Sequence, residues 1–301
     1  MHSPRMRAHE GELMMVACGV LWSMSGITMK YINWNPLLIV GGRGIFSAVI
    51  IYMSMKMSGY KLKATKKSIG IAFLTFMNLV CFVSANKFTT AANAIVLQYT
   101  APIFVLLVTA FILKRKLKAY EIITVLAALF GIVLFFMDQV SGNGMFGNIL
   151  AVTSGFFMGI MYALTGEIKD DGERISGLVL GHTALAVICV PLGYIFTDHA
   201  EITLVPILLV VFLGVVQMGI PYSLYGRATA LISGVAVSLI SMIEPILNPI
   251  WVALIYGEVP GSRALIGAVL IIGAVIAYTI LDARNTLPEG SDSNTEDLRR
   301  S

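Results

Sequence analysis

The sequence predicts an all-α integral membrane protein with ten transmembrane helices in a 5+5 inverted repeat. Three observations lead to this prediction: a composition poor in charge, ten long apolar segments, and an uneven distribution of Lys and Arg between the joints. Hydrophobic residues make up 57% of the 301 residues and charged residues 13%. An ordinary soluble domain is about a quarter charged, so this chain lacks the polar side chains needed to cover a soluble surface.

The ten apolar segments are long enough to cross a bilayer as helices. A crossing helix needs about 20 residues, and in hydrocarbon every backbone amide must be paired within its own helix or in a closed barrel. The segments lack the alternation of barrel strands, and the first does not resemble a cleavable signal. The predicted spans are 12–31, 36–57, 68–86, 91–113, 119–138, 146–167, 176–197, 202–224, 233–257 and 262–282.

Basic residues gather in every second joint. Seventeen Lys and Arg fall in joints on one side, against Lys30, Lys87 and Arg263 on the other. Because basic joints are retained in the cytoplasm, both termini are predicted to be cytoplasmic in an inner-membrane, multi-pass protein. The net charge of +4 is then explained by basic residues that set the orientation in the membrane. Nucleic acid is therefore not an expected partner. Residues 1–11 are predicted to be a cytoplasmic N-terminus, and 283–301 a disordered cytoplasmic tail.

The chain also repeats itself. A shift of 143 positions superimposes Pro102 on Pro245 and Ala110 on Ala253, and a shift of 136 superimposes Gly19 on Gly155. The two halves are residues 12–138 and 146–282. Each has five spans, an odd number, so the second half must cross the membrane in the opposite sense to the first. Secondary transporters use such inverted repeats for alternating access around a site near the bilayer midplane.

At this point the residues resemble a known family, the drug/metabolite transporter superfamily of the EamA type. The resemblance covers nearly the whole chain. It rests on Gly19–Ser23, Arg43, Pro102, Lys114–Lys116, Glu244–Pro245 and Tyr256–Glu258. It implies a 5+5 inverted-repeat exporter of small metabolites, often amino acids, with a central cavity lined mainly by spans one, three, four, six, eight and nine.

Span nine carries a polar stripe. At 100° per residue, its polar side chains fall on one face of an otherwise apolar helix. Such a face either lines a water-filled pathway or joins helices. The pathway reading is favoured because a mid-span carboxylate costs about 2.5–3.5 kcal/mol, which helix packing alone does not require. The stripe comprises Ser233, Ser241, Glu244, Asn248 and Trp251.

Arg43 is the one basic residue well inside a span, and its relation to Glu244 is left open. If the two pair, Glu244 is structural. If they do not, Glu244 is a candidate for proton coupling or for binding a substrate ammonium.

Three prolines are predicted to act as gates. Pro102, Pro245 and Pro249 each remove an intrahelical hydrogen bond and favour a kink. Freed carbonyls beside a pathway can also meet water or a cationic group. The alternative is that proline is simply commoner in membrane helices.

Further polar-tipped residues lie on spans that the resemblance directs toward the cavity. For any single one, ordinary packing is the alternative. The predicted substrate pathway comprises Trp22, Asn78, Gln98, Tyr99, Tyr162, Gln217, Tyr222, Ser241, Glu244 and Asn248. His182 is interpreted as a packed histidine, and the pair Gly155 and Gly159 as a close helix contact.

The rival functions are a channel and an enzyme. Asn35-Pro36 and Asn248-Pro249 suggest an aquaporin-like or other passive small-solute channel, but ten full spans leave no re-entrant loops. The sequence holds no HExxH, GxSxG or Walker motif, and its cysteines form no metal-ligand pattern. We therefore expect a secondary transporter for a small metabolite or amino acid, not an enzyme, without cofactor or metal. The expected partners are substrate, lipid bilayer and, as a candidate coupling ion, protons, in a monomer or homodimer.

Overall fold

The computed structural model describes residues 4–24, 28, 32–137, 144–196, 203–256 and 261–285, and the regular structure in these segments is helical. Helices of the first half are α1 (Pro4–Trp22), α3 (Pro36–Met57), α4 (Lys66–Phe88), α5 (Ala91–Gln98), α6 (Ala101–Leu107), the π-helical turn η1 (Val108–Ile112) and α7 (Ala119–Phe136). Those of the second half are α8 (Met145–Thr165), α9 (Asp171–Ala184), η2 (Leu185–Cys189), α10 (Val190–Ile195), α11 (Leu204–Phe212), η3 (Leu213–Gly219), α12 (Ile220–Ala228), α13 (Gly234–Ser241), α14 (Ile243–Tyr256) and α15 (Ser262–Asn285).

The predicted all-α membrane fold is confirmed. Within the described segments, eight continuous helical stretches are long and apolar enough to cross a membrane, and Gly234–Leu247 is a shorter apolar helix. The first span differs from its prediction: α1 begins at Pro4, ahead of residue 12, because the helix continues into the polar residues before the apolar segment. Its predicted end at residue 31 lies outside the described residues.

Spans four and nine are broken near their middles, where the sequence predicted kinks. α5 ends at Gln98 and α6 begins at Ala101, while α13 ends at Ser241 and α14 begins at Ile243. Pro102 and Pro245 each lie in the first turn after a break, where a missing N–H is tolerated. The breaks therefore occur where proline cannot continue the hydrogen bonding of the preceding helix.

Helices α13 and α15 of the second half begin 143 positions after the corresponding helices α5 and α7 of the first half. Thr90 caps α5 by accepting from Asn93 N, and Ser233, 143 positions later, caps α13 by accepting from Ala236 N. The same shift takes the start of α7 at Ala119 to the start of α15 at Ser262. The repeat is therefore a repeat of local structure as well as of sequence.

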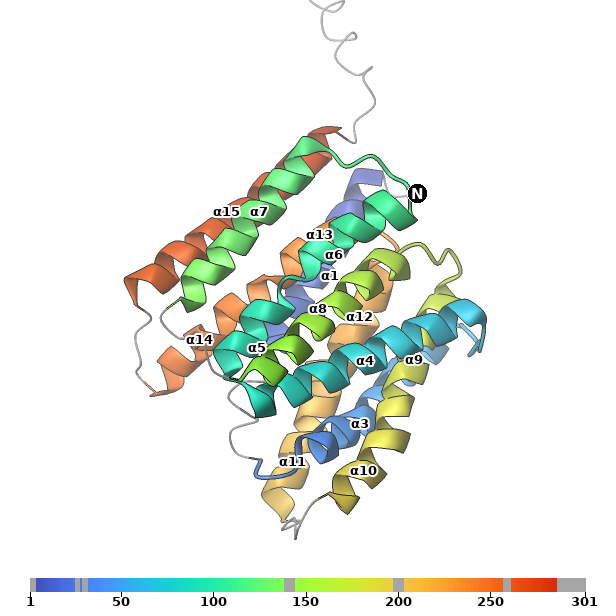
Figure 1. Ribbon diagram of the computed structural model, residues 1–301. Coiled ribbons are helices and arrows are strands. Elements are labelled where there is room, and N and C mark those ends of the chain that lie inside the picture. Colours follow the sequence, from blue (N-terminus) through green and yellow to red (C-terminus); the bar gives the residue numbers. More distant parts are fainter. Residues whose placement is uncertain are drawn as a thin grey trace, which may run out of the picture.

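Helices α7 and α15 are equivalent, and they lie side by side in opposite directions (Figure 1). Tyr120 at the start of α7 donates to Asp282 near the end of α15, at 2.6 Å. Further along, Gly131 of α7 packs against Gly267 and Ile271 of α15. Antiparallel equivalents are what an inverted repeat requires.

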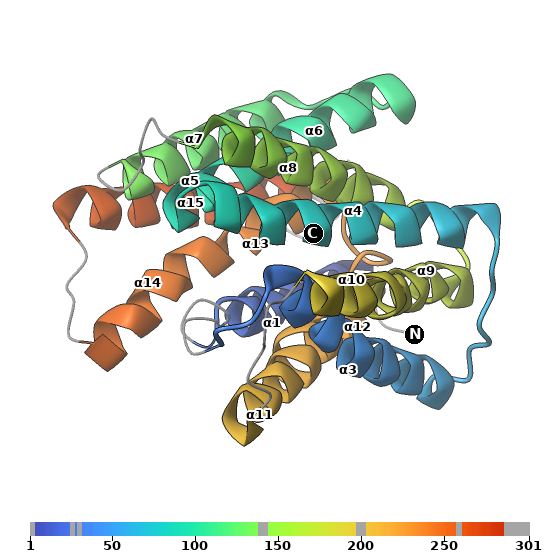
Figure 2. The ribbon, with the colours of Figure 1, turned by 60° about the horizontal axis from the view of Figure 1, so that its bottom comes forward.

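Helices α3 and α9 form the second such pair, also antiparallel (Figure 2). Tyr60, just after α3, contacts Asp171 at the start of α9, whereas Gly193 of α10 packs against Leu38 at the start of α3. The two halves are thus related by a pseudo-two-fold axis across the helices, and their shared interior holds the largest apolar core.

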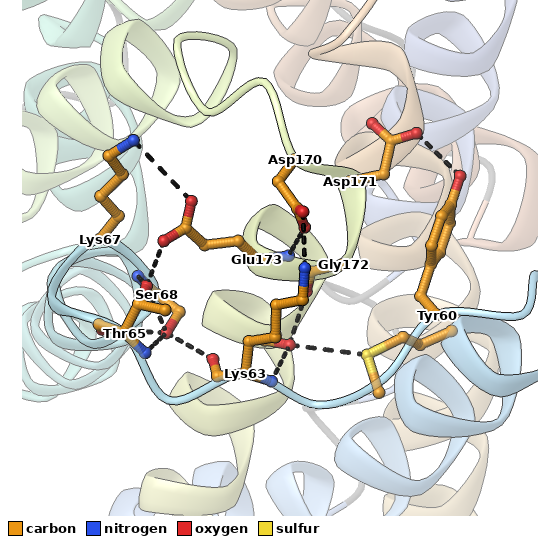
Figure 3. Close-up of polar contacts among 11 residues, drawn as sticks. Tyr60, Lys63, Thr65, Lys67, Ser68, Asp170, Asp171, Gly172 and Glu173 are labelled. Carbon is orange, nitrogen blue, oxygen red and sulfur yellow. Dashed lines mark hydrogen bonds and ion pairs between the residues drawn. The ribbon is translucent and has the colours of Figure 1, made fainter.

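A polar cluster joins the halves at the end of the bundle where the basic joints gather (Figure 3). Lys63 donates to Asp170 at 2.6 Å, Tyr60 donates to Asp171 at 2.8 Å, and Lys67 lies 3.9 Å from Glu173. The hydrogen bond from Lys63 holds the pKa of Asp170 below its ordinary value. The bond to Asp171 raises the pKa of Tyr60, because it stabilises the protonated phenol.

The second-half side of this cluster is held by a buried arginine. Arg174 donates through Nε to Gly226 O and through Nη1 to Ile168 O, each at 2.7 Å, and also bonds Asp171. These bonds fix the start of α9 against the ends of α8 and α12. The joint between α3 and α4 therefore contacts a helix start that Arg174 holds in place.

A glycine exchange tests the α7–α15 contact. A Cβ on Gly267 would lie 2.6 Å from the backbone oxygen of Gly131 and from the backbone nitrogen of Phe135, whereas Gly273 on the same helix has open space around it. We expect Gly267→Ala to lower the unfolding free energy by about 1–3 kcal/mol through overpacking. Gly273→Ala should leave it unchanged or raise it slightly. Thermal melting of purified protein in detergent measures both, and equal melting temperatures would contradict the close contact.

Candidate functional site

The two broken spans meet at a hydrogen bond between halves. Tyr99, the cap residue at the end of α5, donates to Glu244 Oε2 at 2.8 Å, and its hydroxyl also lies 3.2 Å from Ser241 O. Pro245 lacks the N–H that would normally bond Ser241 O, so Tyr99 sits beside the carbonyl that the break frees. The Glu244 carboxylate, partly buried, points into the bundle rather than toward lipid.

The position of Glu244 also suits a negative charge. It lies in the first turn of α14, where unpaired backbone N–H groups and the helix dipole favour an anion. The sequence placed this carboxylate in the middle of one continuous helix. The break turns that position into a helix start, which lowers the electrostatic cost of the charge.

Arg43 lies in the buried interior on α3 and bonds to Gln217 Oε1 of η3. Gln217 donates in turn to Trp22 O at 3.1 Å, at the end of α1. This chain of contacts joins the first half to the second. It also uses the π-helical turn η3, a local irregularity that often marks functional sites.

Arg43 and Glu244 influence each other through space, with attraction between their charges. The hydrogen bonds described above connect each of them to a neutral group, Gln217 for Arg43 and Tyr99 for Glu244. No Arg43–Glu244 salt bridge occurs among the residues that the structure describes. A guanidinium and a carboxylate therefore stand in one region without being joined directly.

Aromatic side chains line the same region. Tyr222 contacts Trp22, with ring centroids 5.5 Å apart, and Tyr225 contacts both Tyr222 and Tyr162, at 6.0 and 5.6 Å. All four side chains are buried. Tyr225 was absent from the predicted pathway, although its position one turn beyond Tyr222 could have indicated it.

His182 is buried, as predicted, and belongs to this region. Its Nδ1 lies 2.7 Å from Ser47 Oγ, and its ring rests on Tyr222 with centroids 4.5 Å apart. Ser47 follows Arg43 by one turn of α3. Nothing in the sequence singled out Ser47, because a serine in an apolar helix most often bonds its own backbone.

Asn78 and Gln98 are bonded to a side chain of α8. Gln98 Nε2 donates to Ser154 Oγ at 2.9 Å and to Asn78 Oδ1 at 3.3 Å, and Ser154 donates to Asn78 at 2.8 Å. All three are buried. Through these hydrogen bonds, the predicted pathway residues Asn78 and Gln98 connect α4 and α5 to α8.

The span-nine stripe divides at the helix break. Ser233 is hydrogen-bonded to Tyr278 of α15, Ser241 donates to Ser238 O within α13, and Trp251 donates to Ser23 at 2.8 Å. Of the predicted gates, Pro102 and Pro245 are buried beside the breaks. The side chains of Asn248 and Pro249 lie outside the described residues.

Glycines bring the helices around the site into close contact, as predicted for Gly155 and Gly159. A Cβ on either would lie 2.6 Å from a backbone oxygen, that of Gln98 or Ala101 respectively. Cys18, Cys81 and Cys189 are buried and form no disulfide. Among the described residues, no group of three or more His, Cys, Asp or Glu side chains could hold a metal ion.

Comparison with known proteins identifies the family. The model of the EamA-like transporter family matches residues 9–137 and again residues 145–280. The chain belongs to the EamA-like transporter family. Each match covers one of the two antiparallel halves, so this EamA-like chain contains the family unit twice. It is a membrane transporter, and its environment is the lipid bilayer.

Relatives of this EamA-like transporter match it over most of their length. An uncharacterized transporter of Clostridium kluyveri is 27% identical over 78% of this chain and 80% of its own. The uncharacterized transporter YoaV of Bacillus subtilis is 22% identical over 89% of this chain and 96% of its own. One crystal structure superimposes with a TM-score of 0.79 at 18% identity, over 92% of this chain and 99% of that one, which shows the same fold.

The junction between the broken spans can be tested by removing one hydroxyl. We expect Tyr99→Phe to lower the unfolding free energy by about 1.5–3 kcal/mol, because a hydrogen bond to a charged group is lost. Tyr194→Phe is the control, since Tyr194 on α10 is 69% exposed. Thermal melting in detergent should separate the two variants by several degrees. Indistinguishable melting curves would show that the Tyr99 hydroxyl contributes nothing to the junction.

Proposed function

We propose that this EamA-like chain is a secondary transporter for a small zwitterionic metabolite such as an amino acid, working by alternating access in the cytoplasmic membrane. Its basic end would face the cytoplasm. The observation that carries the proposal is the placement of Arg43 and Glu244 in one buried, aromatic-lined region between antiparallel halves. A substrate carboxylate suits the guanidinium and a substrate ammonium suits the carboxylate. The family resemblance favours export.

The repeat supports alternating access. Because the halves are antiparallel equivalents, exchanging their conformations would exchange the open and closed ends around a fixed site. Pro102 and Pro245 would act as gates, since each lies next to a break at which a half-helix can reorient. Pro249 is proposed for the same role from its place in the sequence alone.

A passive channel is the alternative, and counterflow distinguishes the two. Proteoliposomes loaded with an unlabelled amino acid are diluted into a trace of the same labelled compound, for each of the twenty amino acids. A carrier accumulates label transiently above equilibrium, by several-fold, because efflux drives exchange. A channel only equilibrates. Monotonic equilibration of a transported amino acid would contradict the carrier, and protein-free liposomes are the control.

We propose that Glu244 also couples transport to protons. When Glu244 is ionised, Tyr99 donates to it. When Glu244 is protonated, its O–H can donate to Tyr99 Oη, and the single tyrosine hydrogen is then free to turn to Ser241 O, which lies 3.2 Å away. Protonation would thus move the hydrogen bond that Tyr99 donates between the halves from the Glu244 side chain to the freed Ser241 carbonyl.

Glu244→Gln tests the coupling. The amide keeps the size of the side chain but cannot ionise, so we expect the variant to lose the pH dependence of transport while still inserting into the membrane. Glu167→Gln is the matched control, because Glu167 pairs with Arg115 at the exposed basic end. Rates in proteoliposomes at several pH values provide the measurement. An unaltered pH profile in Glu244→Gln would remove the coupling role.

A further inference from the structure

Two buried nitrogen atoms near the centre of the bundle have no hydrogen-bond partner. Trp22 Nε1 and His182 Nε2 are both shielded from solvent, and neither bonds to another group in the part of the chain that the structure describes. Buried polar atoms in native proteins are almost always paired. Two exceptions in one region therefore call for an explanation, and a bound polar ligand supplies one.

The two side chains lie against one tyrosine ring. Tyr222 makes a T-shaped contact with Trp22, with ring centroids 5.5 Å apart, and another with His182, with ring centroids 4.5 Å apart. Trp22 ends α1 of the first half and His182 lies in α9 of the second. A ligand bonded to both nitrogens would therefore contact both halves at once.

The contact with Ser47 bears on which nitrogen of His182 carries the proton. Ser47 Oγ lies 2.7 Å from His182 Nδ1 and 3.2 Å from Gly44 O. The single hydroxyl hydrogen of Ser47 goes either to Gly44 O or to His182 Nδ1; when it goes to Nδ1, the imidazole proton lies on Nε2. An indole N–H can only donate. Both unpaired nitrogens are then donors, and the complementary ligand group is an acceptor.

The charge nearby favours an anionic acceptor. Arg43 lies one turn before Ser47 on α3, and its positive charge acts on both His182 and Tyr222. N–H donors beside a cation are the arrangement that holds carboxylates. No carboxylate of the described residues, that of Glu244 included, bonds either nitrogen, so the expected acceptor comes from outside the protein.

We infer that Trp22 Nε1 and His182 Nε2 form a carboxylate-binding subsite, under the charge of Arg43, that receives the carboxylate of the transported molecule. This rests on the proposed function and deepens it, because it orients the substrate: carboxylate toward Trp22 and His182, ammonium toward Glu244. Ser47 is a positioning residue that aims the imidazole. His182 thereby gains a role in specificity.

The experiment compares amino acids with their decarboxylated amines. Binding of the twenty amino acids and of the corresponding amines is measured by calorimetry on full-length protein in detergent, for wild type, Trp22→Phe, His182→Phe and the control Trp34→Phe. Phenylalanine keeps a ring against Tyr222 but has no N–H. We expect Trp22→Phe and His182→Phe to weaken amino-acid binding about tenfold each, as for a lost hydrogen bond to a charged group. Amine binding should change less than about twofold, and Trp34→Phe should match wild type.

The outcomes separate the subsite from the function. Equal weakening of amino acids and amines, or no weakening of either, would overturn the subsite and leave the proposed function standing. If wild-type protein binds neither class, both are overturned. Since misfolding of a variant would also weaken binding, the wild-type protein provides a second test. The ¹⁵N-labelled indole N–H resonance of Trp22, assigned with Trp22→Phe, should move on adding an amino acid that binds and stay in place on adding its amine. A resonance that responds to neither would also overturn the subsite.

Discussion

Hydrocarbon offers no hydrogen bonds to a polypeptide backbone, and this constraint decides where the polar chemistry of the protein must lie. Proline at 102 and at 245 leaves a carbonyl without its usual helical partner in each half. One of these carbonyls, that of Ser241, meets the hydroxyl of Tyr99. The breaks, the Tyr99 hydroxyl and the carboxylate of Glu244 form one arrangement between the two halves.

The two halves share their arrangement of helices but differ in their charged side chains. Arg43 corresponds to Val179 under the shift of 136, and Glu244 corresponds to Ala101 under the shift of 143. The charged groups thus occur once each, at positions whose equivalents are apolar. In the proposed alternating-access mechanism the inverted repeat supplies two related conformations, while the unequal side chains supply one guanidinium, that of Arg43, and one carboxylate, that of Glu244.

Much of the fold could be predicted from the sequence, because hydrophobic length and joint charge report directly on how a chain crosses a bilayer. The helix breaks were foreseen only as kinks at proline. Side-chain partners were harder to foresee. Whether Arg43 meets Glu244 or Gln217 depends on the rotation of α3 against η3, and whether Gln98 meets Ser154 depends on how closely Gly155 lets α8 approach. Such rotations come from packing between distant segments, which no local pattern encodes.

The cluster in Figure 3 differs in kind from the buried junction. Lys63 and Asp170 are nearly half exposed, at 44% and 47%, so solution ions reach them. At physiological ionic strength the screening length is about 8 Å, and added salt shortens it further. The bond between Tyr99 and Glu244 is shielded from such screening. The electrostatic attraction between the halves at the basic end therefore weakens as the surrounding electrolyte becomes more concentrated. The hydrogen bond between the halves at the centre does not weaken in this way.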